Sequence, residues 1–154
     1  MANVSLNKMI EKSMKTNWDR PALSDYKGVT LYYRDVARRI EKIHLIFEIC
    51  GIKKGDKVAL CSKNQANWGV AFLACTTYGA VPVPILHEFK SSNIAHLVNH
   101  SEARILFVGD VIWEGLMQSD MPALDAVILL TDFSLVYTAN DSIDDAREHL
   151  NEYF

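Results

Sequence analysis

Apolar residues recur at helical spacing in the first fifty residues of the chain. Leu6, Met9, Ile10 and Met14 predict a helix over residues 5–15. A second stripe predicts a longer helix over residues 34–49, and its members are Val36, Ile40, Ile43, Phe47 and Cys50. Between these helices, two short runs at residues 22–26 and 29–33 flank Lys27 and Gly28. Their Tyr, Val and Thr content and the central glycine predict a β-hairpin.

Beyond residue 56 the pattern changes to short, continuously apolar runs that alternate with helical segments. The runs predict strands at residues 57–62, 80–85, 104–109 and 126–131, with helices between them at residues 66–78, 92–100 and 113–118. Continuous apolar runs are typical of strands buried on both faces, as in a parallel sheet. The sequence therefore predicts an α/β fold, in which an N-terminal helix and β-hairpin precede a mostly parallel, doubly wound βαβαβαβ subdomain.

Three parts follow along the chain. Residues 1–50 hold the N-terminal helix, the hairpin and the long helix, and residues 51–135 form the parallel α/β subdomain. Residues 136–154 are predicted to be an acidic helical tail. We find no internal repeat.

Composition and charge narrow the class of protein. The 154 residues are 49% hydrophobic and 23% charged, which suits one globular domain and excludes a disordered chain. Residues 1–63 carry 13 basic and 7 acidic side chains, whereas residues 64–154 carry 3 basic and 12 acidic ones. The basic residues alternate with acidic ones and do not cluster with aromatic residues. We therefore expect no nucleic-acid partner.

Residues 64–87 contain no Asp, Glu, Lys or Arg. Gly79, Pro82 and Pro84 interrupt this apolar run, so we expect a buried helix and strand and no transmembrane segment. The three cysteines, Cys50, Cys61 and Cys75, form no C-x-x-C pair, which argues against a zinc site or a redox dithiol. Reduced thiols and polar first residues, which do not resemble a signal peptide, predict a cytoplasmic location.

A search for reactive constellations names no catalytic, cofactor-binding or metal-binding residue. No G-x-G-x-x-G and no G-x-x-x-x-G-K-[ST] occurs, and residues 51–57 (GIKKGDK) are interpreted as a helix C-cap and a turn. His96 and His100 have the spacing of a metal pair but lack a third ligand, so we interpret them as solvent-facing. His44 and His87 are interpreted as structural. Gly109 and Asp110 end a strand that opens toward a possible crevice.

Residues 51–84 carry a more specific signal. Their sequence, GIKKGDKVALCSKNQANWGVAFLACTTYGAVPVP, resembles the opening of the AMP-forming adenylate synthetases, a superfamily that includes acyl-CoA ligases, luciferases and peptide-synthetase adenylation domains. Upstream, residues 31–36 (LYYRDV) resemble the family segment L-T-Y-x-E-L, and downstream residues 92–107 resemble the following helix and strand. The resemblance covers about residues 4–132 in consistent order.

Two local departures from the family pattern concern helix capping. Tyr32 stands where the family usually has Thr or Ser, so Thr30 or the backbone turn is expected to replace the hydroxyl cap of the second helix. Ser91 and Ser92 are expected to cap the helix that follows them.

The resemblance also implies what the chain lacks. The family's Thr/Ser/Gly-rich phosphate loop, its ribose-binding Asp and its catalytic Lys have no counterpart in this sequence. The chain is therefore identified as an N-terminal fragment of an acyl-CoA synthetase, and it resembles the long-chain fatty acid–CoA ligases. For the parent enzyme the resemblance implies ATP, Mg²⁺, coenzyme A and a fatty acid. The fragment alone is expected to be inactive, to pack against the remainder of its chain, and to self-associate through an exposed apolar patch.

Other interpretations remain open at this point. Another adenylate-forming enzyme, such as an aryl-CoA ligase or a peptide-synthetase adenylation domain, would share these motifs. A standalone α/β ligand-binding or interaction module would be expected if the natural chain stopped near Phe154. An unrelated flavodoxin-like domain would share the fold alone.

Overall fold

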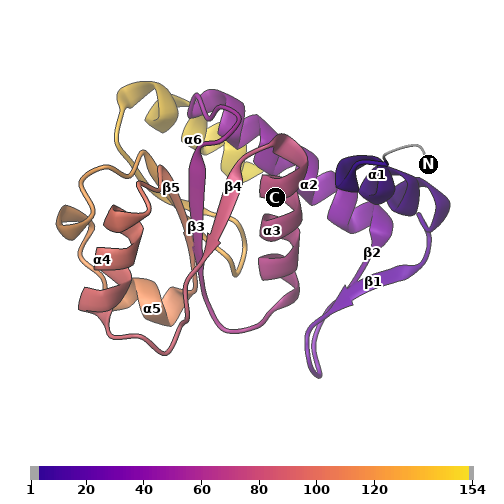
Figure 1. Ribbon diagram of the computed structural model, residues 1–154, viewed down its shortest axis with the longest axis horizontal. Coiled ribbons are helices and arrows are strands. Elements are labelled where there is room, and N and C mark those ends of the chain that lie inside the picture. Colours follow the sequence, from indigo (N-terminus) through magenta and orange to yellow (C-terminus); the bar gives the residue numbers. More distant parts are fainter. Residues whose placement is uncertain (1–3, 153–154) are drawn as a thin grey trace.

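The computed structural model describes residues 4–152, excluding the side chains of residues 147, 148 and 150–152. Helices cover both faces of a five-stranded sheet, and a further helix and a two-stranded hairpin stand to one side (Figure 1). The elements are α1 Leu6–Thr16, β1 Pro21–Ser24, β2 Thr30–Tyr32, α2 Tyr33–Ile49, β3 Lys57–Cys61, α3 Ala66–Tyr78, β4 Val81–Pro84, α4 Ser91–His100, β5 Ile105–Val108, α5 Asp110–Glu114, the 3₁₀ helix η1 Gln118–Asp120, β6 Ala126–Leu129, β7 Leu135–Thr138 and α6 Asp141–Glu152.

The strands of the larger sheet follow the order β4-β3-β5-β6-β7. β3 pairs in parallel with both β4 and β5, and β5 pairs in parallel with β6. From β3 the chain therefore passes to the edge strand β4. It then crosses back through α4 to β5, on the other side of β3, and continues to β6. This arrangement confirms the predicted fold class and places a reversal of strand order between β3 and β5.

Side chains on each central strand alternate between two apolar cores. On β3, Val58 and Leu60 pack into the core beneath α2, α3 and α6, whereas Ala59 and Cys61 pack into the core beneath α4 and α5. All four of these residues are fully buried. Burial on both faces is the physical reason that the strand sequences are continuously apolar.

The edge strand β4 carries two prolines. The N–H groups of Val81 and Ile85 donate to Asp56 O and Leu60 O, each at 2.8 Å, so the odd-numbered residues face β3. Pro82 therefore occupies a position whose N–H would point toward the open edge of the sheet, and proline has no N–H to offer there. This edge is poorly suited to pairing with another strand.

Strand β7 and helix α5 correct the sequence interpretation. Residues 136–138 were predicted to belong to the helical tail, but that helix begins only at Asp141. Residues 135–138 instead pair antiparallel with β6 after a tight turn in which Phe133 N donates to Leu129 O at 2.9 Å. The short helix predicted at residues 113–118 begins at Asp110 and ends before Gly115. Pairing with β6 selects the strand, since four residues carry too weak a periodic signal alone.

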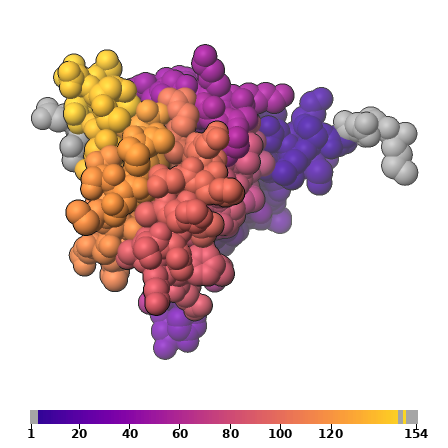
Figure 2. All heavy atoms as spheres, turned by 60° about the vertical axis from the view of Figure 1, so that its left-hand side comes forward, coloured from indigo at the N-terminus to yellow at the C-terminus, as the bar shows by residue number. Residues whose placement is uncertain are grey.

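The hairpin of β1 and β2 is confirmed, and its tip projects from the main body (Figure 2). It packs against α3, because a β-carbon on Gly69 would lie 3.1 Å from Leu23 Cδ1. The tip also caps that helix: Asp25 Oδ1 accepts a hydrogen bond from Ala66 N at 2.7 Å, whereas the N-cap residue Gln65 makes no capping bond with its side chain. A carboxylate from a distant segment thus satisfies the helix terminus.

Replacing Asp25 with alanine is expected to lower the free energy of unfolding by about 1 kcal/mol, because an N–H at the start of α3 loses its acceptor. Urea unfolding followed by circular dichroism measures this loss. Asp25→Asn keeps a capping oxygen and should lose less. Asp19→Ala is the matched control, since Asp19 is exposed and its ion pair with Arg34 lies on the surface. Equal stability of the Asp25→Ala and Asp19→Ala variants would contradict the capping role.

Thr30 as the cap of α2 and the serine cap of α4 are both wrong. Thr30 does not cap α2, because its hydroxyl lies 2.9 Å from Ser24 Oγ across the hairpin. The helix start is instead satisfied by Asp35, whose Oδ2 accepts from Tyr32 N at 2.9 Å. At α4, Ser91 is the first helical residue, and the N-cap position belongs to Lys90.

The three cysteines are free thiols buried in the core. Burial raises the pKa of Cys50 and of Cys75 to about 12 and that of Cys61 to about 11. Among the described residues, no helix is long and apolar enough to cross a membrane.

These thiols are expected to resist alkylation in the folded chain. The thiolate is the reactive form, and both its pKa and its burial keep it unavailable near neutral pH. Titration with a chromogenic disulfide should therefore show three thiols that react only after urea is added. Ser119→Cys, which adds a thiol at an exposed position, supplies the fast-reacting control. Rapid reaction of any native thiol would show that its core opens locally.

Candidate functional site

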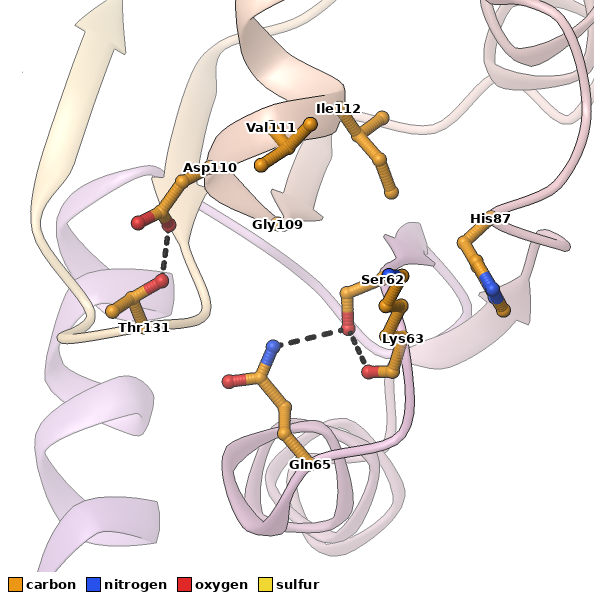
Figure 3. A pocket seen from close by; sticks show the side chains of 9 residues that line it. All are labelled: Ser62, Lys63, Gln65, His87, Gly109, Asp110, Val111, Ile112 and Thr131. Atoms are coloured by element: carbon orange, nitrogen blue, oxygen red, sulfur yellow. Dashed lines mark hydrogen bonds between the residues drawn. The ribbon is translucent and has the colours of Figure 1, made fainter. Parts of the chain in front are cut away.

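A pocket of about 410 Å³ opens at the carboxyl edge of the sheet, where the strand order reverses (Figure 3). The segments that follow β3 and β5 form its two sides, and the loops after β4 and β6 complete it. It is lined by Ser62, Lys63, Gln65, His87, Gly109, Asp110, Val111, Ile112 and Thr131. In open α/β sheets ligands bind in the crevice at such a reversal. Its place at the reversal of strand order identifies this pocket as the candidate site.

The floor of the pocket is tightly built. Ser62 is buried, and its hydroxyl donates to the carbonyl oxygen of Lys63 at 2.7 Å and accepts from Gln65 Nε2 at 3.4 Å. A β-carbon on Gly109 would lie 3.2 Å from Ser62 Cβ. The absence of a side chain at Gly109 therefore lets the β5 loop lie directly against the β3 loop.

The polar groups on the β6 side are engaged with each other. The hydroxyl of Thr131 donates to Oδ1 of Asp110, so the end of β6 is tied to the start of α5 (Figure 3). Asp110 is the one carboxylate among the pocket's lining residues. The Asp110 carboxylate is thus fixed in place by this hydrogen bond at one side of the pocket.

Lys63 and His87 line the opposite side. Within the described part of the chain, neither the Lys63 ammonium group nor the His87 ring makes a hydrogen bond or an ion pair. Val111 and Ile112 contribute an apolar surface from α5. The pocket therefore combines two uncommitted basic side chains, one engaged carboxylate and an apolar wall.

The surroundings of the pocket expose large apolar side chains. Val111 is 81% exposed, and in the loop after β4 Leu86 is 63% exposed and Phe89 40% exposed. Apolar surface of this kind marks sites of protein contact or ligand binding. The expected self-association of the chain stays a prediction.

The structure separates the histidines that the sequence singled out. His44 lies between helices, with Nε2 2.9 Å from Ala74 O and 3.0 Å from Thr77 Oγ1. His96 and His100 are exposed on α4, where their rings stack at 6.0 Å. His87, interpreted as structural, lines the pocket.

Sequence reasoning placed Gly109 and Asp110 beside a crevice but did not connect them with Lys63 or His87. The available signal was position: each lies just beyond the end of a predicted strand, and parallel strands end at one edge. Only the strand order shows which of these ends are neighbours.

Comparisons with known proteins agree with this architecture. The sequence matches the family model described as AMP-binding enzyme over residues 10–151. It is 29% identical over 103 residues to the crotonobetaine/carnitine–CoA ligase of Proteus mirabilis (strain HI4320), covering 65% of this chain and 20% of that protein. It is 26% identical over 105 residues to long chain acyl-CoA synthetase 1 of Arabidopsis thaliana, covering 66% of this chain and 16% of that protein.

A solved structure shares the fold. The anthranilate CoA ligase AuaEII, in complex with anthranoyl-AMP, superposes with a TM-score of 0.75 at 19% identity, covering 90% of this chain and 27% of that one. The chain thus spans about a fifth of the length of the curated relatives it matches. Because the family model covers nearly the whole α/β layer, the chain belongs to the AMP-binding enzyme family.

Proposed function

We propose that this chain is the N-terminal α/β subdomain of an AMP-forming acid–CoA ligase whose acid is a long-chain fatty acid. The observation that carries the proposal is the family match over residues 10–151, which includes every strand of the large sheet. In the whole enzyme the acid and ATP would give an acyl-adenylate and pyrophosphate, and the acyl group would then pass to coenzyme A. The carboxyl edge of the sheet would form one wall of the substrate crevice.

This subdomain would act as a scaffold. Adenylation of an acid needs a metal ion and donors that stabilise the charge developing on phosphate oxygens. Among the described residues, no three His, Cys, Asp or Glu side chains come together to hold a metal ion. Because the sequence has no counterpart of the family's Thr/Ser/Gly-rich phosphate loop, we derive no adenylation step from these residues.

The choice of a long-chain fatty acid is supported by one of the relatives named above. One relative is a long-chain acyl-CoA synthetase, while the other relative and the solved structure act, by their names, on carnitine derivatives and on anthranilate. The substrate must therefore be tested by activity.

The test is an assay of the complete product of the native gene. Acid-dependent exchange of pyrophosphate into ATP is measured with palmitate, acetate, benzoate and carnitine as the acids. Exchange with palmitate at the highest kcat/KM is the expected result. A preference for another acid would overturn the long-chain assignment, and no exchange with any acid would overturn the ligase assignment. The 154-residue chain, assayed in parallel, is expected to give no exchange.

A further inference from the structure

We propose that the pocket between β3 and β5 binds the oxyanion group of a small ligand, a phosphate or a carboxylate, through Lys63 and His87. Both side chains line the pocket, and they reach it from the ends of different strands. This assignment uses the pocket alone and does not depend on the ligase reaction. Its failure would leave the exchange assay on the complete gene product unaffected.

The basic side chains that line this pocket favour an anionic ligand over a cationic one. Beyond Lys63 the chain has only two further basic residues before its acidic tail, Lys90 and Arg104, and Arg104 is held by Asp56 and Asp125 at the other edge of the sheet. Lys63 and His87 nevertheless line the same pocket, and neither side chain has a partner in the described residues. An ammonium group that lines a pocket binds an oxyanion through short, charge-assisted hydrogen bonds, and an imidazole ring N–H can donate to the same oxyanion.

The acidic groups nearby do not compete for these cations. Asp110 accepts the Thr131 hydroxyl on the opposite side of the pocket. Glu88 follows His87 in sequence but is exposed and does not line the pocket. A cation would meet two basic groups here, whereas an anion would meet two donors and one carboxylate that lies across the pocket and is hydrogen-bonded to Thr131.

The apolar walls of the pocket indicate the chemistry of the part of the ligand next to its oxyanion. Val111 and Ile112 face the pocket, and its volume of about 410 Å³ exceeds what a bare oxyanion fills. A ligand with an apolar body next to its oxyanion would cover both walls. One of the two amide hydrogens of Gln65 points to Ser62, which leaves the other for the ligand.

The experiment is a titration of the ¹⁵N-labelled chain followed by amide chemical shifts. The probes are inorganic phosphate and octanoate, with octylamine as a cation of matched length. We expect saturable shifts, at millimolar probe, confined to residues 62–65, 87 and 109–112. Saturation by phosphate identifies a phosphate site, and tighter binding of octanoate identifies a carboxylate with an apolar tail.

The variants separate this site from general attraction of anions. The double variant Lys63→Gln, His87→Gln should weaken binding at least about tenfold, since it removes the ammonium group and the ring N–H donor. Lys12→Gln removes one positive charge from an exposed face of α1 and should leave binding unchanged. Equal shifts with octylamine, equal weakening by Lys12→Gln, or no saturable shift with either anion would each overturn the proposal.

Discussion

Replacing Phe107 with alanine is expected to lower the free energy of unfolding by about 3–5 kcal/mol. Phe107 is fully buried at the centre of β5, between two other strands. Its ring packs edge-on against Phe47 of α2 at 6.2 Å and against Phe133 of the β6–β7 turn at 6.3 Å. The alanine would leave a cavity that three elements border, and a rigid sheet can close it only in part.

Chemical denaturation followed by tryptophan fluorescence measures the effect of Phe107→Ala. Phe89→Ala is the matched control, because it removes the same atoms from a side chain that is 40% exposed in a loop. Its cost should stay within about 1 kcal/mol. Phe107→Leu should lie between the two variants, since it fills most of the cavity. A loss below about 1.5 kcal/mol for Phe107→Ala would show that the core repacks.

Replacing Arg104 with methionine is expected to destabilise the chain by about 2–3 kcal/mol, because several charged and carbonyl oxygens lose their donor at once. Arg104 lies at the amino edge of the sheet, just before β5. Its guanidinium group donates to Asp125 Oδ2 from Nε at 2.7 Å, to Asp56 Oδ2 and Gly51 O from Nη1 at 2.9 Å, and to Cys50 O from Nη2 at 2.9 Å. It joins the end of α2 to the starts of β3, β5 and β6.

Arg104→Lys is the informative companion variant. It keeps the positive charge but cannot reproduce a planar fork that contacts four oxygens, so it should recover only a small part of the loss. Thermal unfolding of both variants measures the difference. Full recovery by lysine would show that charge alone accounts for the contribution of Arg104.

The Arg104→Met variant should also lose part of its acid sensitivity. A hydrogen bond from Lys53 N–H, and then the Arg104 guanidinium, hold the pKa of Asp56 below its ordinary value of 3.8. Stability from a lowered carboxyl pKa is fully present above the unfolded pKa and is lost as pH falls through the folded one. Below about pH 4 the wild-type chain should therefore lose this stability, and Arg104→Met should lose less of it.

The sequence predicted most of the fold because its local and tertiary preferences agree. The helix predicted at residues 66–78 has those bounds in the structure, and the four predicted parallel strands are all present within one or two residues. In each of these elements the apolar pattern extends along the whole element, so periodicity alone identifies it. The family assignment followed from the same stretch of chain, since residues 51–84 carry the motifs in order.

The sequence did not predict features that depend on which segments become neighbours. The capping of α3 by Asp25 joins residues that are 41 positions apart, and no local pattern marks a carboxylate as the cap of a distant helix. Likewise, β7 has four residues and is recognisable through its pairing with β6. The four-oxygen contact of Arg104 depends on the approach of two loops to the start of β5.

The sequence by itself determined the family, the fold class and the two-sided core, because apolar periodicity and motif order are properties of consecutive residues. The tertiary structure alone decided the pocket. Lys63, His87 and Asp110 follow three different strands. Only the strand order β4-β3-β5-β6 makes the ends of these strands neighbours at one edge of the sheet. Strand order is set by the crossovers through α3 and α4, which depend on packing across the sheet and leave no periodic trace in the chain.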